Sequence, residues 1–229
     1  MRRASVYTVL ILFSIIAGNL WGQEMSDRLI IRLPMPDTTG YVSLEKTLKD
    51  RQSTRDFSAL SISLKELSQL LWAGQGITRG KMYRTTPSAG ALYPLELYIV
   101  VRNVSGLEQG LYHYIPKRLR LEQLHSGPIM QEIAAAALGQ SVFDKCAAAI
   151  LITGVVERTY TKYGKRAEQY VLIEVGHAAQ NILLQATALG LGAVPLGAFH
   201  GDKMKKIFRG NRGYGLMGKP YYIIPIGHK

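Results

Sequence analysis

One long and almost entirely apolar run, AAAILITGVV at residues 147–156, constrains the fold more than any other stretch. A strand with one solvated face alternates apolar and polar residues, whereas a run without polar positions is typical of a strand buried on both faces. A sheet with such a strand at its centre needs a packed layer on each side. The chain is therefore expected to form a layered fold around a buried central strand.

A second long pattern covers residues 167–192, AEQYVLIEVGHAAQNILLQATALGLG, and repeats at spacings of three and four. This spacing predicts a long helix. Its expected buried face consists of Val171, Leu172, Val175, Ala178, Ile182, Leu183 and Ala186. Apolar residues also occur on other sides of this helix, more than one sheet face can cover, and we therefore expect a dimer.

The remaining elements complete an α+β fold. Residues 63–76 predict a helix in which Ser63 is the N-cap, Glu66 completes a capping box, and Gly74 or Gly76 ends the helix. Residues 96–104 predict a strand, 110–124 a hairpin turning at Pro116 and Lys117, 130–140 a short helix and 219–229 a final strand. The 229 residues, 47% of them hydrophobic, suit one globular domain with a substantial core.

The first 22 residues differ from the rest. Two Arg precede an apolar run of about a dozen residues, and small and polar positions follow, which is typical of a secretory signal peptide. An uncleaved membrane anchor is the alternative. We expect a linker or arm at residues 23–45, a folded domain at 46–229, and export to the periplasm or the medium.

The chain is basic, with a formal net charge of +12 that falls to +10 when Arg2 and Arg3 leave with the signal peptide. Such a charge suits either a generally basic exported protein or a binder of nucleic acid or anionic membranes. The basic residues are scattered in ones and twos, which favours a generally basic exported protein.

The single cysteine, Cys146, lies among apolar residues and is expected in the core, with a reactive thiol as the alternative.

Common catalytic motifs are missing from the sequence. The glycines do not follow the G-x-G-x-x-G spacing of dinucleotide-binding folds, and Ser88 lacks the G-x-S-x-G setting of serine hydrolases. Cys and His residues do not follow metal-binding spacing, so we expect no metal. These absences disfavour a dinucleotide fold and a serine hydrolase.

One candidate cluster is basic. In RQSTR, residues 51–55, the side chains of Arg51, Ser53 and Arg55 share one side if the segment is extended. Two guanidiniums and a hydroxyl suit a phosphate group, because Arg forms paired, charge-assisted hydrogen bonds to phosphate oxygens. A solvated basic turn remains equally compatible with the pattern.

Two other clusters consist of small residues: PSAG at residues 87–90 and GAVPLGAF at 192–199. Small residues let the backbone approach a planar ligand closely, and its N–H groups can donate to ring nitrogens and oxygens. Arg84 and two threonines precede the first stretch. Ordinary tight turns are the alternative for each stretch.

Two polar groups flank or lie on the long helix. Lys162 and Tyr163 precede it and suit proton transfer, with an exposed loop as the alternative. Glu174, His177 and Asn181 share one helix face and suit internal hydrogen bonding, with catalysis as the less favoured reading.

Taken together and in order, these stretches resemble the flavin-dependent nitroreductase superfamily, and within it the SagB/ThcOx-type dehydrogenases. The matching segments are RQSTRDF, LSQLLWAGQGIT, RTTPSAGALYPLELYIVV, GLYHY, KYGKRAEQYVLIEVGHAAQNILLQATALGLGAVPLGAF and YYIIPIGHK. They cover nearly all of residues 48–229. The resemblance implies a mostly antiparallel sheet flanked by helices and a homodimer with a shared site for noncovalent FMN.

The resemblance also implies which residues contact FMN. The phosphate and ribityl chain would lie against Arg51, Gln52, Ser53 and Arg55. The ring would lie against Pro87, Ser88, Ala89 and Gly90 of the partner subunit. The ring edge would face Pro195, Leu196, Gly197 and Ala198, with further contacts from Gln140, His228 and Lys229.

For function, the resemblance implies hydride transfer through flavin N5 between a donor, either a reduced nicotinamide or an organic substrate, and an acceptor. Lys162 and Tyr163 match the family's Lys–Tyr pair, which acts as base and proton relay. A flavin-binding protein without turnover is the alternative. Relatives often end in Gly-Arg where this chain ends Gly-His-Lys. No nucleic-acid partner is expected.

Overall fold

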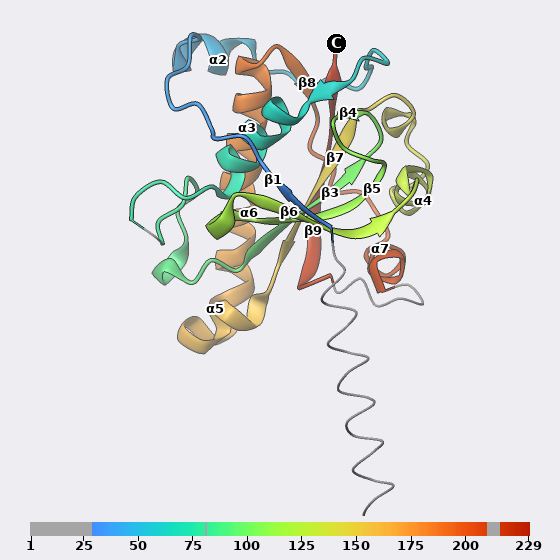
Figure 1. Cartoon of the computed structure of the whole chain (residues 1–229). Helices are drawn as coiled ribbons and strands as arrows, with labels where there is room; N and C mark the ends of the chain where they lie inside the picture. The colour runs from blue at the N-terminus through green and yellow to red at the C-terminus, as the bar shows by residue number, and fades with distance from the viewer. Residues whose placement is uncertain (1–28, 81, 210–215) are drawn as a thin grey trace, which may run out of the picture. The chain divides into compact units, whose positions relative to one another are not determined.

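The computed structural model describes residues 29–80, 82–209 and 216–229, so the expected signal peptide at residues 1–22 lies outside them (Figure 1). Seven strands form one sheet, and the pairings that join β6, β5, β3, β7, β9 and β8 are all antiparallel. This confirms the expected mostly antiparallel α+β fold. In spatial order the strands are β1 (Ile30–Arg32), β6 (Arg120–Ser126), β5 (Gly110–Ile115), β3 (Leu95–Val101), β7 (Ala148–Gly154), β9 (Lys219–His228) and β8 (Leu191–Ala193).

Strand β7 is the buried central strand that the apolar run predicted. All its residues are buried, and it pairs with β3 on one side and β9 on the other. Side chains alternate between the two faces of a strand. In β3, Leu97 and Ile99 accordingly join the core on one face, whereas Tyr98 and Val100 join the core on the other.

Helices cover both faces of the sheet (Figure 1). Apolar residues of α3 (Leu64–Gln75) and α6 (Ala167–Ala188) belong to one core, and those of α4 (Met130–Ala136) and α7 (Gly201–Arg209) to the other. Two further helices, α2 (Leu44–Asp50) and α5 (Val156–Tyr163), lie near opposite ends of α6. The shorter elements are β2 (Ile62–Ser63), which pairs in parallel with β4 (Val104–Ser105), and the 3-10 turns η1 (Ala89–Ala91), η2 (Pro116–Arg118), η3 (Ser141–Phe143) and η4 (Gly164–Arg166).

Local sequence signals set the bounds of α3 and of the β5–β6 hairpin. The Ser63 hydroxyl accepts from the backbone N–H of Glu66, and the Glu66 carboxylate accepts from the backbone N–H of Ser63, so the predicted capping box is confirmed. The helix ends at Gly76, one of the two predicted positions. The hairpin turns through η2, which includes the predicted Pro116 and Lys117.

Helix α6 begins where predicted but ends at Ala188, four residues before the end of the predicted stretch, because Leu191 and Gly192 belong to β8. One residue of its expected buried face is exposed. Leu172 is 50% exposed, and its neighbour Ile173 is 48% exposed. The expected face was too wide, because Val171 and Val175 already fill the space against the sheet on that side. An apolar patch on α6 is therefore left uncovered in a single chain.

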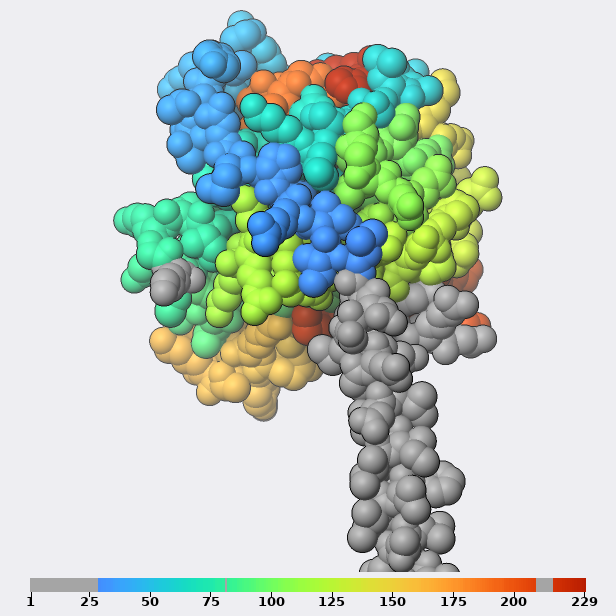
Figure 2. Space-filling model, in the orientation of Figure 1, coloured from blue at the N-terminus to red at the C-terminus, as the bar shows by residue number. Residues whose placement is uncertain are grey.

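The segment after β1 packs onto the domain (Figure 2). The backbone N–H of Leu33 donates to the Leu119 carbonyl, the Ser68 hydroxyl donates to the Pro34 carbonyl, and Gln69 exchanges two hydrogen bonds with Asp37. Residues 33–37 of the expected arm are thereby held against α3 and the end of η2.

Helices α5 and α7 do not follow from any pattern noted in the sequence. Helix α5 is short and mostly polar, and α7 shows only a brief apolar spacing through Met204 and Phe208.

The prediction for Cys146 is confirmed: the residue is fully buried, and burial raises the pKa of its thiol to about 12. Within the described ranges, no helix has the length and apolar character needed to cross a membrane.

Candidate active site

The extended segment at residues 51–58, which follows α2, pairs with β8 and with the end of β9. Residues from the start and from the end of the domain are thereby brought together. Ser53 forms a parallel bridge with Ala193 of β8, and the backbone N–H of Thr54 donates to the Ala193 carbonyl at 3.0 Å. Further on, the backbone N–H of Ser58 donates to the His228 carbonyl at 2.9 Å. Gly192 permits this approach, because a side-chain carbon there would lie 2.6 Å from Thr54 Cγ2.

These contacts gather four basic residues, Arg51, Arg55, His228 and Lys229, which we call the basic edge. None of the four takes part in an ion pair within the described residues. The hydrogen bond from Lys46 and the charges of Lys49 and Lys229 lower the pKa of Asp50, which precedes Arg51. Basic side chains that form no ion pair suit an anionic ligand such as a phosphate.

Strand β8 leads from the basic edge into the turn at residues 195–198. Leu196 exchanges two backbone hydrogen bonds with Ile223 of β9, at 2.8 and 3.0 Å. Gly197 and Ala198 are exposed, and Gln140 Nε2 donates to the Ala198 carbonyl at 3.3 Å. The structure thus brings Gln140, predicted as a site residue, next to this turn.

The second turn of small residues, at 87–90, lies against the Lys162–Tyr163 pair. Gly90 has a φ of 63°, in the left-handed region that favours glycine. A side-chain carbon at this position would lie 3.1 Å from both Lys162 Nζ and Tyr163 Oη. The two polar groups therefore converge on the one residue of the turn that has no side chain.

Helix α5 positions the Lys162–Tyr163 pair, which lies in its last turn and not in a loop. Arg158 of the same helix donates to the Tyr93 carbonyl at 3.1 Å and pairs with Glu96 of β3 at 2.6 Å. The Tyr163 ring packs on Tyr170 of α6, with centroids 4.6 Å apart. These contacts fix the helix against the strand that follows the 87–90 turn.

Behind this turn lies Glu174, whose position the sequence did not indicate. It is 3% exposed, and its Oε1 has no hydrogen-bond partner within the described residues. Burial raises the pKa of Glu174 to about 7, although a hydrogen bond from Ser88 and the charge of Arg84 act in the opposite direction. The carboxyl group can therefore gain or lose a proton near neutral pH.

The predicted polar stripe on α6 divides in the structure. Glu174 faces Ser88, and Asn181 donates to the Thr86 hydroxyl at 3.2 Å, so both contact the segment that leads into the 87–90 turn. His177 is exposed instead. The helical spacing indicated the stripe, but not the segment that it would contact.

The predicted site residues fall into two regions at opposite ends of α6 (Figure 1). The basic edge, Gln52, Ser53, Gln140 and the 195–198 turn form the first region, next to β8, which follows the C-terminus of α6. The 87–90 turn and the Lys162–Tyr163 pair form the second, at its N-terminus. The helix has 22 residues and is therefore roughly 33 Å long at 1.5 Å per residue. One chain does not unite the two regions.

The layered α+β domain thus carries a basic edge in one region and a Lys–Tyr pair beside a glycine turn in the other. The chain belongs to the nitroreductase family, whose model matches residues 48–228. A Methanocaldococcus jannaschii protein named as a nitroreductase is 38% identical over 205 residues, which cover 90% of this chain and 99% of the relative. The Escherichia coli microcin B17-processing protein McbC is 30% identical over 117 residues, covering 49% of this chain and 43% of that protein. These matches confirm the predicted nitroreductase superfamily.

Solved structures agree with this fold. A nitroreductase-type crystal structure from Anabaena variabilis has a TM-score of 0.73 and 28% identity, covering 88% of this chain and 42% of that one. A nitroreductase from Desulfovibrio desulfuricans, solved in complex with FMN, has a TM-score of 0.58 and 19% identity, covering 82% of this chain and 86% of that one. The chain is therefore an oxidoreductase of the nitroreductase family.

Across the described residues, no group of three or more His, Cys, Asp or Glu could hold a metal ion.

Proposed function

We propose that this oxidoreductase depends on noncovalent FMN and transfers hydride between a donor, either a reduced nicotinamide or an organic substrate, and an acceptor such as a quinone or nitroaromatic. The observation that carries the proposal is the convergence of the basic edge with the 195–198 turn. Unpaired cations at one end and exposed small residues at the other fit a molecule with a phosphate tail and a flat ring.

Specific residues would hold FMN in this proposal. Arg51 and Arg55 would bind the phosphate, together with Gln52, Ser53 and the C-terminal His228 and Lys229. Residues 195–198, with Gln140 behind them, would lie along the ring edge, and residues 87–90 of a partner subunit would lie against the ring. When bound, FMN supplies the capacity to accept and release hydride.

The chain's own contribution to proton transfer would come from Lys162 and Tyr163. Their polar atoms both lie beside Gly90. Lys162 Nζ could take a proton from a substrate and pass it to Tyr163 Oη while the Tyr163 hydroxyl releases its own proton to solvent. In the opposite direction the pair would deliver a proton to an acceptor. This role suits a dehydrogenation in which a heteroatom of the substrate must lose a proton.

A homodimer completes the proposed site. The two regions are separated by the length of α6 in one chain, and the apolar Leu172 and Ile173 are about half exposed on that helix. Burial of such residues against a second copy would bring the 87–90 turn of one chain to the basic edge of the other.

We also propose, from the N-terminal sequence pattern, that the protein is exported.

The test is an absorption spectrum of the purified protein with added FMN, followed by anaerobic addition of NADH or NADPH. We expect a bound-flavin spectrum with peaks shifted from those of free FMN, and bleaching when a suitable donor is added. A protein that binds no FMN after reconstitution contradicts the proposal. Bound FMN that no donor reduces would favour the alternative of a flavin-binding protein without turnover.

A further inference from the structure

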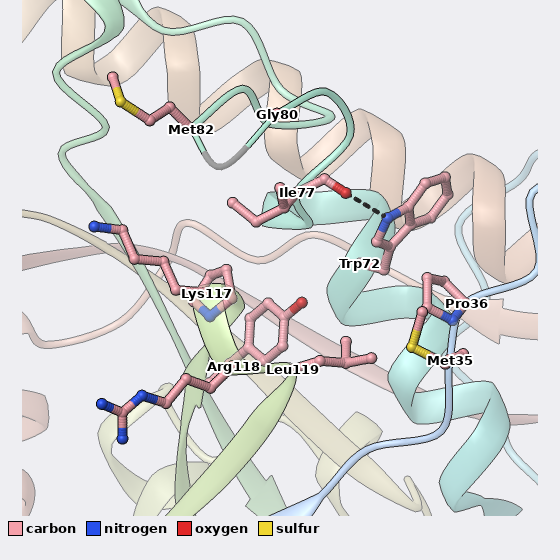
Figure 3. A pocket seen from close by; sticks show the side chains of 11 residues that line it. Met35, Pro36, Trp72, Ile77, Gly80, Met82, Lys117, Arg118 and Leu119 are labelled. Atoms are coloured by element: carbon pink, nitrogen blue, oxygen red, sulfur yellow. Dashed lines mark hydrogen bonds between the residues drawn. The ribbon is translucent and has the colours of Figure 1, made fainter.

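A pocket of about 780 Å³ lies outside both site regions. Its walls come from the arm, from α3 and the loop after it, and from the β5–β6 hairpin (Figure 3). The lining residues are Met35, Pro36, Trp72, Ile77, Gly80, Met82, Tyr114, Pro116, Lys117, Arg118 and Leu119. The volume falls in the range of about 300–1,000 Å³ that is usual for small-molecule sites.

Most of the lining is apolar. Met35 and Pro36 lie on one side of the pocket, and Ile77 lies above it in the view of Figure 3. The indole N–H of Trp72 donates to the Ile77 carbonyl at 3.3 Å, so this ring has no free polar group to offer a ligand. A flat apolar body is the ligand shape that such walls accommodate best.

The side opposite Met35 and Pro36 is basic (Figure 3). Lys117 and Arg118 are exposed, and neither takes part in an ion pair or side-chain hydrogen bond found in the described ranges. The hairpin fixes their position, because they form the 3-10 turn η2, which ends at Leu119 in a left-handed conformation. Two adjacent cations without acidic partners favour an anionic group on the ligand.

The floor includes a buried hydroxyl that nothing in the described residues satisfies. Tyr114 is 1% exposed, and its hydroxyl has no hydrogen-bond partner there. Buried polar atoms are paired in the great majority of cases, so this one calls for a specific explanation. Burial raises the pKa of Tyr114, which keeps the hydroxyl protonated and able to donate.

We propose that this pocket binds a small molecule with a flat, apolar body, a hydrogen-bond acceptor on that body and one carboxylate or sulfonate group. The body lies between Trp72 and the arm, the acceptor receives the Tyr114 hydrogen bond, and the anionic group contacts Lys117 and Arg118. The inference does not rest on flavin chemistry, since binding involves no electron transfer.

Three probes of one shape test the proposal by isothermal titration calorimetry on the full chain. Fluorenone-2-carboxylate has all three features, fluorene-2-carboxylate lacks the acceptor, and fluorenone-2-carboxamide lacks the charge. We expect the first to bind with one site per chain and the other two about 5–10-fold more weakly, in line with one hydrogen bond or one pair of exposed charges. Saturating FMN should leave these affinities unchanged.

Variants assign the contacts. Tyr114→Phe keeps the ring and removes an unpaired hydroxyl, so the protein should fold, and the two carboxylates should then bind equally. The double variant Lys117→Gln, Arg118→Gln should abolish the preference for the carboxylate over the carboxamide, whereas Lys145→Gln, an exposed lysine elsewhere, should preserve it. The proposal is overturned if fluorenone-2-carboxylate shows no saturable binding, if FMN displaces it, or if either pocket variant leaves the probe ranking unchanged.

Discussion

The basic edge and the 87–90 turn are built in different ways. The basic edge depends on backbone pairing between distant segments, with Ser53 bridged to Ala193 and Ser58 bonded to His228, and its charged side chains extend without acidic partners. The 87–90 turn depends on side chains, with Lys162 and Tyr163 packed on Gly90 and the buried Glu174 behind Ser88. The first region is suited to hold an anion, and the second to move protons beside a flat ligand. Each lacks what the other provides.

The largest effect should come from separating the two regions in the proposed dimer. Ile173→Glu places a charge on the exposed apolar patch of α6, and burying an unpaired charge in an interface is strongly unfavourable. We expect a monomer by light scattering that no longer retains FMN on gel filtration. Leu60→Glu, at a 64% exposed position away from α6, is the control and should remain dimeric. A wild-type monomer that retains FMN would refute the shared site.

The next effect concerns proton transfer in the second region. Lys162→Gln should lower kcat by about 10²–10⁴-fold, the usual contribution of a general acid or base. FMN affinity should stay within about threefold, because the phosphate contacts lie in the other region. Lys165→Gln, in the adjacent turn η4, is the matched control with unchanged kcat. Equal losses in both variants would remove the special role of the pair.

A smaller effect should appear in the stability of the second region. The folded state raises the pKa of Glu174 from 4.5 to about 7, so it binds more protons than the unfolded state in that interval. The free energy of unfolding should therefore fall as pH rises from 4.5 to 7, by an amount on the order of 3 kcal/mol from this residue. Urea denaturation should show that Glu174→Gln lacks this component.

The control for that experiment lies on the same helix. Lys219, which donates to Glu168 at 2.7 Å, lowers the pKa of this exposed residue, so any contribution of Glu168 is lost as pH falls. Glu168→Gln should thus change the pH dependence in the opposite direction and only slightly. A wild-type profile identical to that of Glu174→Gln would mean that the Glu174 carboxyl titrates normally.

The smallest expected effect is on FMN affinity. It should show whether the basic edge binds the phosphate of FMN or the ring. Arg51→Gln should weaken FMN about 10-fold, since one hydrogen bond to a charged group contributes about 1.5–3 kcal/mol and neighbouring cations remain. Riboflavin, which has no phosphate, should bind equally to both proteins. Lys49→Gln, two residues earlier in α2, provides the control. Parallel losses for FMN and riboflavin would place Arg51 away from the phosphate.

Much of the scaffold could be predicted because its signals are local. The apolar run at 147–156 and the three-and-four spacing at 167–192 indicated β7 and α6, and Ser63 with Glu66 indicated the start of α3. The width of the buried face of α6 could not be predicted, because the sheet that covers Val171 and leaves Leu172 exposed is made of distant strands.

The candidate residues could be found in the sequence, but not their grouping. The approach of Thr54 to Gly192 and of Lys162 to Gly90 depends on strand order and helix placement. Glu174 was noted only as part of a polar stripe, and its raised pKa follows from burial behind a turn that the helical spacing does not reveal. The roles of these residues in flavin binding remain predictions for the experiments above.

The length of α6 has a consequence for genetics. If two copies of the chain complete each other's sites, a chain carrying Arg51→Gln and a chain carrying Lys162→Gln damage different halves of each site. Their mixed dimer then contains one site with both defects and one site with neither. Two impaired alleles could thus complement each other, whereas each would remain defective when paired with itself.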